Sequence, residues 1–304
     1  MQSLKVMLLA GGPDKERPVS LMAAEQVAAA LREAGHQVQQ HDIGPDNLSA
    51  LDRFAAWPGD VVFPLLHGPW GEGGELQQHL DHRDIPYVGA KAAAARRCID
   101  KYQTKQIFDQ QKLPTPAYEL LSRGKHPKIV PPVVVKALCE GSSFDLKICH
   151  DDKQLAEGLE ILFARHEQLL LEQYIPGKEL TVGILDKRAL PAIEIIPGPA
   201  FYDYEAKYTR NDTQYLFDID LPAAVLDDVG QMAMRAHRAL GCRHLSRFDF
   251  MIDEDDQPWM IEVNTMPGFT SHSLLPMAAL RMGLALPALA DRLVQMGAGL
   301  SDDL

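Results

Sequence analysis

Three oxygen-bearing side chains near the C-terminal end of the chain have the spacing of a metal site. Asp249, Glu262 and Asn264 lie on two apolar segments, 246–253 and 258–264, that a short polar turn joins. Alternate residues of a strand point to one face, so a hairpin would bring the three side chains together. Two carboxylates and an amide suit Mg²⁺ when nucleotide phosphates complete its coordination. Solvated strand-edge acids are the alternative, but the aromatic and apolar flanks favour buried carboxylates, which need a cation.

Two neighbouring features could bind anions. Arg247 lies on the same predicted strand, and its rigid set of donors suits a phosphate or a transient oxyanion. Residues 264–274 are rich in small and hydroxyl side chains and precede an apolar helical stretch, so their backbone N–H groups could also bind an anion. A capped helix start is the alternative for this segment.

Three weaker signals lie earlier in the chain. The loop 140–143, Glu-Gly-Ser-Ser, follows the strand that carries Lys136, an arrangement similar to phosphate-binding loops in general, although an ordinary turn is the alternative and no GxxxxGK[ST] motif occurs. His67 follows an apolar strand, where a structural histidine is the alternative to a ligand-binding one. Glu16 lies in the loop after the first strand, where it could pair with an ammonium group or be a surface acid.

The elements that must position these residues begin with a parallel α/β unit. An apolar run at 5–10 ends in two glycines, as expected for a buried strand that enters a loop. A helix should follow, with Ser20 as its N-cap and Gly35 as the left-handed residue after its end. The pattern predicts further short strands and hence a small doubly wound domain over residues 1 to about 95, with strands at 38–41, 61–66 and 86–88.

The rest of the chain has a less regular, α+β order. The patterns predict helices at 100–111, 151–164 and 227–241 and strands at 133–137, 168–174, 180–185, 190–196, 246–253 and 258–264. Residues 197–221 form a polar stretch that is too long for an ordinary connection, which suggests a functional loop.

Composition limits the class of protein. A chain of 304 residues that is 46% hydrophobic can bury a substantial core and form two or three units. The net charge of -12 argues against nucleic acid as a partner. The four cysteines have no CxxC spacing and are expected to be reduced, buried thiols, which favours the cytoplasm. No signal sequence or membrane-spanning stretch is predicted.

The motifs occur in an order that resembles the D-alanine:D-alanine ligase family of the ATP-grasp superfamily. The resemblance spans nearly the whole chain, and the agreement of seven ordered motifs is far more specific than any single one. The motifs are Gly11-Gly12 with Glu16-Arg17-Pro18-Val19-Ser20-Leu21; His67-Gly68 with Gly71-Glu72; Asp100-Lys101; Val135-Lys136 with Glu140-Gly141-Ser142-Ser143; residues 201–208; Arg247 with Asp249; and Glu262 with residues 264–268 and 271–274.

The resemblance implies an ATP-grasp fold, of mixed α/β and α+β class, with an N-terminal doubly wound (pre-ATP-grasp) domain. Its domains would be an α/β substrate domain at 1–98, a central subdomain at 99–185 and a C-terminal subdomain with the metal site and a lid loop at 186–304. ATP would lie between the last two, with two Mg²⁺ (or Mn²⁺) ions. Two molecules of D-alanine would be the other substrates, and the protein would be a homodimer.

The family's functional residues carry over to matching positions. ATP would be bound by Lys101, Lys136, Ser143, Glu172, Gln173, Tyr174, Ile175, Glu179 and Lys207, and the metal ions by Asp249, Glu262 and Asn264. The amino acids would be bound by Glu16, His67, Ser273 and Leu274, and catalysis would involve Glu16, Ser142, Tyr208, Arg247 and Gly268.

The implied reaction is the ATP-dependent joining of a carboxylate to an amine through an acylphosphate. The first D-alanine would attack the γ-phosphate, and the amine of the second would attack the acylphosphate, with Arg247 and the N–H of Gly268 holding the oxyanion. Residues 197–221 would close as a lid and exclude water. Tyr208, a neutral phenol in that loop, favours a dipeptide over an ester product. In a bacterium the dipeptide would serve peptidoglycan precursor synthesis.

One departure from the family pattern affects the nucleotide loop. Asp145 stands where the family has glycine, and a carboxylate beside the triphosphate would repel it, so ATP binding would be weakened or the loop rearranged. Two alternatives therefore stay open: a related ATP-grasp ligase that joins other amino acids, and a catalytically impaired nucleotide-binding homologue. The intact lysines, Arg247 and metal ligands favour an active ligase.

Overall fold

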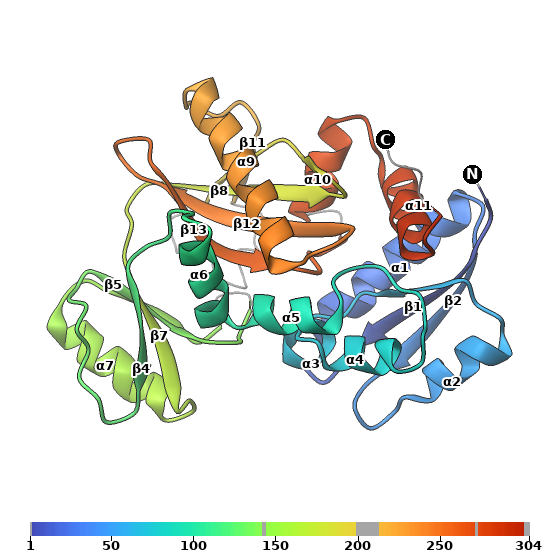
Figure 1. The fold of residues 1–304 in the computed structure, drawn as a ribbon, viewed down its shortest axis with the longest axis horizontal. Helices are drawn as coiled ribbons and strands as arrows, with labels where there is room; N and C mark the ends of the chain where they lie inside the picture. Colours follow the sequence, from blue (N-terminus) through green and yellow to red (C-terminus); the bar gives the residue numbers. More distant parts are fainter. Residues whose placement is uncertain (1, 142–143, 199–212, 271–272, 301–304) are drawn as a thin grey trace.

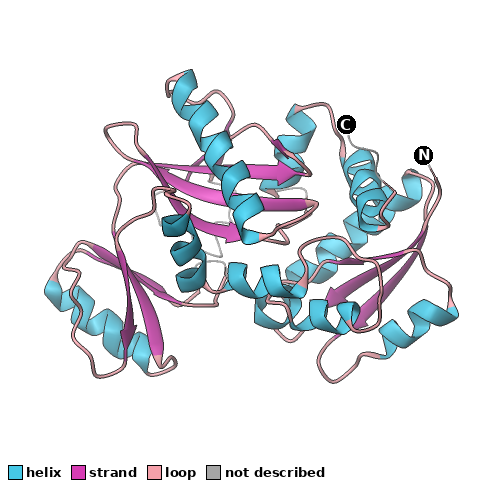
Figure 2. Ribbon diagram, viewed as in Figure 1, coloured by secondary structure: helices cyan, strands magenta, loops and turns pink. Residues whose placement is uncertain are grey.

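A computed structural model describes residues 2–141, 144–198, 213–270 and 273–300. The described chain contains three β-sheets with helices packed around them (Figure 1). Figure 2 shows the same arrangement by secondary structure, with the parallel N-terminal sheet at one end and a small four-stranded sheet at the other.

The N-terminal sheet is parallel, as predicted. Its order is β2 (Gln37–Ile43), β1 (Lys5–Gly11) and β3 (Val61–Pro64). The apolar side chains of β1 are fully buried because helices cover the sheet. The prediction of a strand at 86–88 is wrong, because only an isolated bridge between Val62 and Tyr87 forms there.

Helix α1 (Arg17–Glu33) begins earlier than predicted, so the assignment of Ser20 as its N-cap is wrong. Pro18 occupies the first turn, where its fixed φ favours the helix and its missing N–H is not needed. Ser20 is buried inside the helix. Its hydroxyl accepts from the N–H of Gly11 at 2.9 Å and donates to the carbonyl of Leu65, which ties α1 to the ends of two strands. Gly35 has a φ of +93°, which confirms the left-handed residue expected after this helix.

Short helices connect this sheet to the rest of the molecule. They are α2 (Ser49–Ala56), α3 (Gly68–Glu72), α4 (Glu75–Asp81), α5 (Ala92–Ile99) and α6 (Lys101–Gln110). Asp100 caps α6 by accepting from the N–H groups of Tyr102 and Gln103. This cap fixes Lys101 at the first position of the helix, close to the centre of the molecule.

The four-stranded sheet is antiparallel and has its own core. Its order is β4 (Tyr118–Ser122), β7 (Gln168–Gln173), β5 (Val133–Ala137) and β6 (Leu146–Cys149), and α7 (Asp152–Phe163) covers one face. Leucine and valine side chains from the strands and from α7 form a separate hydrophobic cluster. Strands β4 and β6 were not predicted.

The third sheet carries the predicted hairpin. Its order is β11 (Gln214–Leu216), β10 (Ile193–Ile196), β8 (Lys178–Leu185), β12 (Leu245–Ile252) and β13 (Pro258–Asn264), with β9 (Arg188–Ala189) paired to β8. Part of the segment predicted as a loop at 197–221 is therefore strand β11. The helices of this part are α9 (Ala223–Leu240), α10 (Leu274–Arg281) and α11 (Leu286–Gly297).

Helix α11 returns to the N-terminal domain and packs against α1 and β3 (Figure 1). The largest hydrophobic core consequently combines side chains from both ends of the chain, including Leu8, Val27 and Phe63 with Leu289 and Leu293. Among the described residues no single helix is long and apolar enough to cross a membrane. The pair α10 and α11, bent by 105°, meets that criterion only when the two are joined.

Candidate active site

The β12–β13 hairpin aligns the predicted metal ligands. Asp249 lies opposite Glu262, and Arg247 lies opposite Asn264, with a register shift after Asp249. The residues therefore share one end of the ribbon, as the alternation of strand side chains predicted.

Asp249 is the most enclosed of these side chains. It is buried and accepts from the hydroxyl of Thr181 on β8. The guanidinium of Arg247 donates to both of its carboxylate oxygens, at 3.0 and 2.9 Å. This two-point pairing compensates a charge that burial would otherwise penalise.

Glu262 and Asn264 complete the oxygen donor set. Glu262 lies 3.7 Å from the ammonium of Lys101, and the side-chain oxygen of Asn264 accepts from the N–H of Met266 at 2.9 Å. Among the described residues no cluster of three or more His, Cys, Asp or Glu side chains is arranged to hold a metal ion alone. The donor chemistry of Asp249, Glu262 and Asn264 instead fits Mg²⁺ that shares its coordination with phosphates.

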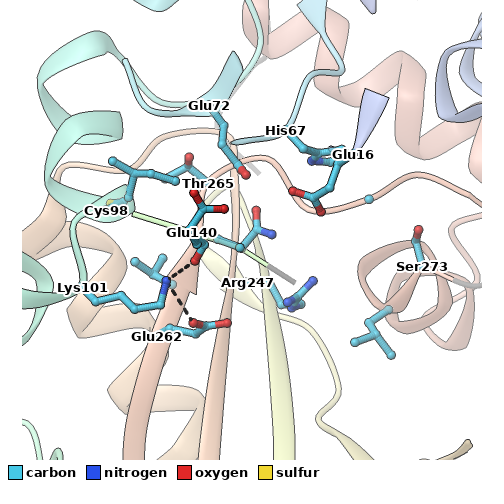
Figure 3. Close-up of a pocket in the computed structure, with 16 residues that line it drawn as sticks. Glu16, His67, Glu72, Cys98, Lys101, Glu140, Arg247, Glu262, Thr265 and Ser273 are labelled. Carbon is cyan, nitrogen blue, oxygen red and sulfur yellow. Dashed lines mark hydrogen bonds and ion pairs between the residues drawn. The ribbon is translucent and has the colours of Figure 1, made fainter. Parts of the chain in front are cut away.

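A small polar pocket of about 90 Å³ lies next to the hairpin. Figure 3 shows Glu16, His67 and Glu72 pointing into it from above, and Lys101, Arg247 and Glu262 below them. Its walls also include the predicted metal ligand Asn264 at the end of β13 and, in and before the first residue of α10, the predicted catalytic and amino-acid-binding residues Gly268, Ser273 and Leu274. Glu16 and His67 are positioned by the starts of α1 and α3, which follow strands β1 and β3.

A side chain at position 268 would crowd Ser273. A Cβ there would lie 2.6 Å from the hydroxyl oxygen of Ser273, which itself accepts from the N–H of Thr270 at 2.9 Å. The absence of a side chain at Gly268 lets its backbone approach the pocket directly.

Burial changes the proton affinity of two side chains in this pocket. Burial, together with the charge of Glu16, raises the pKa of Glu72 to about 8, although its carboxylate accepts from the N–H of Gly68 at 3.1 Å. Burial lowers the pKa of His67 in spite of the opposing charge of Glu16. His67 hydrogen-bonds with the backbone of Met266, and its buried Nε2 has no hydrogen-bond partner within the described chain. At neutral pH the pocket therefore presents a neutral imidazole and a protonated carboxyl group.

A larger, more apolar pocket of about 450 Å³ adjoins the first, between the four-stranded sheet and the third sheet. Lys101, Glu140, Gly141 and Glu262 line both pockets. The larger pocket has apolar walls that include Phe144, Ile148 and Met251. It is also lined by predicted ATP- and metal-binding residues: Lys136, Glu172, Gln173, Tyr174, Ile175, Glu179 and Asp249. Lys101 is held between the two pockets, where its ammonium donates to the carbonyl of Glu140 at 2.6 Å.

Glu172 is the centre of a buried charge cluster at the wall of the larger pocket. Its carboxylate contacts the ammonium of Lys105 at 2.6 Å and that of Lys136. Burial alone would raise the pKa of Glu172, but the two ammonium groups outweigh it and lower the pKa. Lys105 was not predicted as a site residue, although its spacing of four from Lys101 on a helix places it toward the same region. Glu140 and Glu72 were likewise missed.

The expected repulsion between Asp145 and a triphosphate is not supported by the structure. Asp145 has a φ of +52°, and its carboxylate contacts Arg165 and His166 at 2.8 Å each. Its neighbours Phe144 and Leu146 line the larger pocket, whereas Asp145 does not. The carboxylate of Asp145 instead points toward the end of α7, where its charge is compensated.

Every predicted site residue that the structure describes lines one of these two pockets. Four further predicted site residues lie outside the described residues: Ser142, Ser143, Lys207 and Tyr208. Two antiparallel sheets enclose a pocket lined by lysines and carboxylates, and the strand-to-helix loops of a parallel sheet contribute to a polar pocket beside it. This arrangement defines the ATP-grasp class of ligases.

Comparisons with known proteins narrow this class to a family. The D-ala D-ala ligase C-terminus model matches residues 107–295 and the D-ala D-ala ligase N-terminus model matches residues 46–90. A D-alanine–D-alanine ligase from Syntrophotalea carbinolica is 38% identical over 299 residues, which cover 97% of this chain and 96% of the relative. The chain therefore belongs to the D-alanine–D-alanine ligase family, as the motifs predicted.

Solved structures agree. The crystal structure of D-alanine–D-alanine ligase from Bacillus anthracis has a TM-score of 0.87 and 30% identity and covers 98% of both chains. The same enzyme complexed with ATP has a TM-score of 0.84 and 28% identity, again over 98% of both chains. These similarities confirm the predicted ATP-grasp fold.

Proposed function

We propose that this protein is an ATP-dependent ligase that joins two molecules of D-alanine. The observation that carries the proposal is the contact between the two pockets. The nucleotide-sized pocket and the small polar pocket share Lys101, Glu140, Gly141 and Glu262, so a terminal phosphate in the first can meet a carboxylate in the second.

The first step activates the carboxylate of one D-alanine. A carboxylate oxygen attacks the γ-phosphorus of ATP, the bond to the β-phosphate oxygen breaks, and ADP leaves. Lys101 and Lys136 reduce the repulsion between the two anions because both line the larger pocket as ammonium groups. Glu16, in the small pocket, is suited to bind the ammonium of this first substrate.

The second step forms the peptide bond. The amine of the second D-alanine attacks the acyl carbon, and phosphate leaves when the tetrahedral intermediate collapses. Arg247 and Gly268 line the same pocket, where the guanidinium of Arg247 and the N–H of Gly268 would stabilise the oxyanion. The neutral imidazole of His67 offers its unpartnered Nε2 to a substrate proton. Ser273 and Leu274 lie where the second carboxylate would bind.

Asp249, Glu262 and Asn264 are the residues that would hold two Mg²⁺ or Mn²⁺ ions. Bound divalent metal neutralises charge on the phosphates. The proposal also includes a lid within residues 197–221 but outside strand β11, homodimeric assembly and a cytoplasmic location. The length and polarity of that segment support the lid.

Product analysis tests the proposed function. Purified protein is incubated with ATP, Mg²⁺ and D-alanine, released phosphate is measured, and the products are identified by mass. We expect one phosphate for each dipeptide, with little product from L-alanine. D-Lactate as the second substrate should give less product than D-alanine at pH 7. Phosphate release with another amino acid but not with D-alanine would indicate a related ligase. ATP binding without any turnover would indicate an impaired homologue.

A further inference from the structure

Lys105 is a fully buried cation beside the larger pocket, but it does not line it. Its exposed fraction is 0%, and its ammonium lies 2.6 Å from a carboxylate oxygen of Glu172. It also donates to the hydroxyl of Thr115 at 2.6 Å, and that hydroxyl donates to the carbonyl of Met260 on β13 at 2.8 Å. The side chain thus begins on α6 and ends at Glu172 on β7 and at Thr115, which links it to β13.

The charge balance of this cluster suggests why a buried lysine is present. Glu172 faces two ammonium groups, those of Lys105 and Lys136, so the cluster holds two positive charges and one negative charge. Under the proposed function Lys136 must contact the phosphates of ATP. Its departure from Glu172 would leave a neutral Lys105–Glu172 pair, whereas without Lys105 it would leave a buried, unpaired carboxylate, which is strongly unfavourable.

We propose that Lys105 is a positioning residue for the nucleotide: it serves as the permanent counter-ion of Glu172 and thereby lets Lys136 exchange this carboxylate for the phosphates of ATP. Lys105 also keeps Glu172 ionised and fixed at the pocket wall. A carboxylate held there accepts hydrogen bonds from an amino group and repels a carbonyl oxygen, so it favours a 6-aminopurine over a 6-oxopurine. This inference rests on the proposed function because it assigns ATP to the larger pocket.

The main test is the substitution Lys105→Met, which keeps the length of the side chain and removes its charge. Calorimetric titration with Mg²⁺ and ATP, in the absence of amino acid, should show a dissociation constant at least about tenfold above that of the wild type. In steady-state ligation the KM for ATP should rise by a similar factor while kcat changes less than about twofold, since Lys105 does not line the small pocket where the bond forms. Lys153→Met, at an exposed position of α7, is the matched control and should bind ATP like the wild type.

A double substitution separates this role from a merely structural one. In the background of Glu172→Gln there is no carboxylate to leave unpaired, so adding Lys105→Met should weaken ATP binding by much less than it does in the wild type. Wild-type protein should prefer ATP over inosine triphosphate, and Glu172→Gln should reduce that preference. If Lys105→Met fails to fold, as judged by circular dichroism, Thr115→Val provides the second test. It loosens the lysine without removing its charge and should weaken ATP binding to a smaller extent.

The outcomes distinguish the inference from the proposed function. Equal ATP affinities of the wild type and Lys105→Met, or additive effects of the two substitutions, would overturn the role of Lys105 alone. Wild-type protein that binds ATP but forms no dipeptide would overturn the proposed function and leave the role of Lys105 to be decided by the titrations. Wild-type protein that binds no ATP would overturn both.

Discussion

At the scale of single residues, the site is organised by charges that are already paired before any substrate binds. Arg247 donates to both oxygens of Asp249, Lys101 lies against Glu262, and Lys136 contacts Glu172. These groups are the ones expected to contact metal, phosphate and oxyanion. Under the proposed function, substrate binding would therefore exchange one set of ion pairs for another, so buried charges need not be left without a partner.

The first prediction concerns Asp249 as a metal ligand. Asp249→Asn keeps the shape of the side chain and removes its charge. Loss of an outer-shell partner of a metal ligand is already worth about 10–100-fold, so loss of a direct ligand should lower kcat/KM by about 100-fold or more. Phosphate release at several Mg²⁺ concentrations measures this effect, and chelation of the metal should abolish activity reversibly.

Asp255→Asn, at an exposed position in the turn of the same hairpin, is the matched control and should retain wild-type activity. Wild-type activity in Asp249→Asn would show that this carboxylate is not a metal ligand.

The second prediction concerns Glu72, whose pKa burial raises to about 8 from an ordinary 4.5. At a pH between 4.5 and about 8, the carboxyl group of Glu72 binds more protons in the folded protein than in the unfolded chain. The contribution of Glu72 to the free energy of unfolding is therefore fully present below its ordinary pKa of 4.5. It falls as the pH rises toward 8, by at most about 1.4 kcal/mol for each pH unit. Glu72→Gln removes this dependence, so the variant should gain stability relative to the wild type as pH rises.

Urea unfolding of both proteins at pH 5, 6, 7 and 8, without ligands, measures the difference. Stability curves that run parallel over this range would contradict the raised pKa of Glu72.

At the scale of elements, Asp145 anchors the end of the loop between β5 and β6. Asp145 adopts a φ of +52°, a conformation that aspartate tolerates better than most residues. Its carboxylate then pairs with Arg165 and His166 at the end of α7. The N–H of Ala137 also donates to the carbonyl of Asp145, at 3.1 Å, so this hydrogen bond joins the two ends of the loop.

The third prediction follows from this geometry. Asp145→Asn retains the tolerance for positive φ and removes the charge. Because the carboxylate does not line the nucleotide pocket, the dissociation constant for ATP should change by less than about twofold. Stability should fall by no more than about 1 kcal/mol, since Arg165 is more than half exposed. Calorimetric titration and urea unfolding measure the two quantities, and a large gain in ATP affinity would show that Asp145 does repel the nucleotide.

The elements differ in how well the sequence predicts them, for physical reasons. Buried runs such as 5–10 and the hairpin at 246–264 were predicted because strong apolar patterning and turn residues agree there. Strands β4, β6 and β11 were missed because they are short and of mixed polarity, so pairing with distant strands decides their conformation. The start of α1 was misplaced because Ser20 has the chemistry of an N-cap but uses its hydroxyl for a tertiary contact.

The residues of the site also differ in how well the sequence predicts them. Motif residues such as Arg247 and Glu262 could be predicted from order and spacing alone. The role of Lys105 could not be predicted, because it depends on a buried contact between α6 and Glu172 on β7 that forms only in the fold. The pairing of Asp145 with Arg165 depends likewise on a contact across twenty residues that no local pattern specifies.

At the scale of the whole molecule, the two ends of the chain share one hydrophobic core. Helix α11 packs against α1 and β3, and Leu289 and Leu293 are fully buried in the cluster that includes the strands of the N-terminal sheet. The N-terminal domain therefore depends for its stability on a helix that is distant in sequence. Glu16 and His67, at the ends of β1 and β3, are held in place by the same packing.

The fourth prediction tests this dependence. Leu293→Ala should lower the free energy of unfolding by about 2–5 kcal/mol because it leaves a cavity in a fully buried position. Amides of β1 should exchange hydrogen faster in the variant, as measured by mass spectrometry of peptides from residues 4–11. Ile161→Ala, at an exposed position of α7, is the control. Unchanged exchange in β1 would show that the two parts are stabilised independently.

The separate core of the four-stranded sheet has a mechanical consequence. Because the first and last thirds of the chain share one hydrophobic core, the amino-acid pocket and the metal ligands belong to a single rigid unit. The unit of β4 to β7 with α7 has an interior of its own and contacts that body through buried charges such as the Lys105–Glu172 ion pair. The width of the nucleotide pocket, which lies between the two units, is therefore set by ion pairs and not by a shared hydrophobic core.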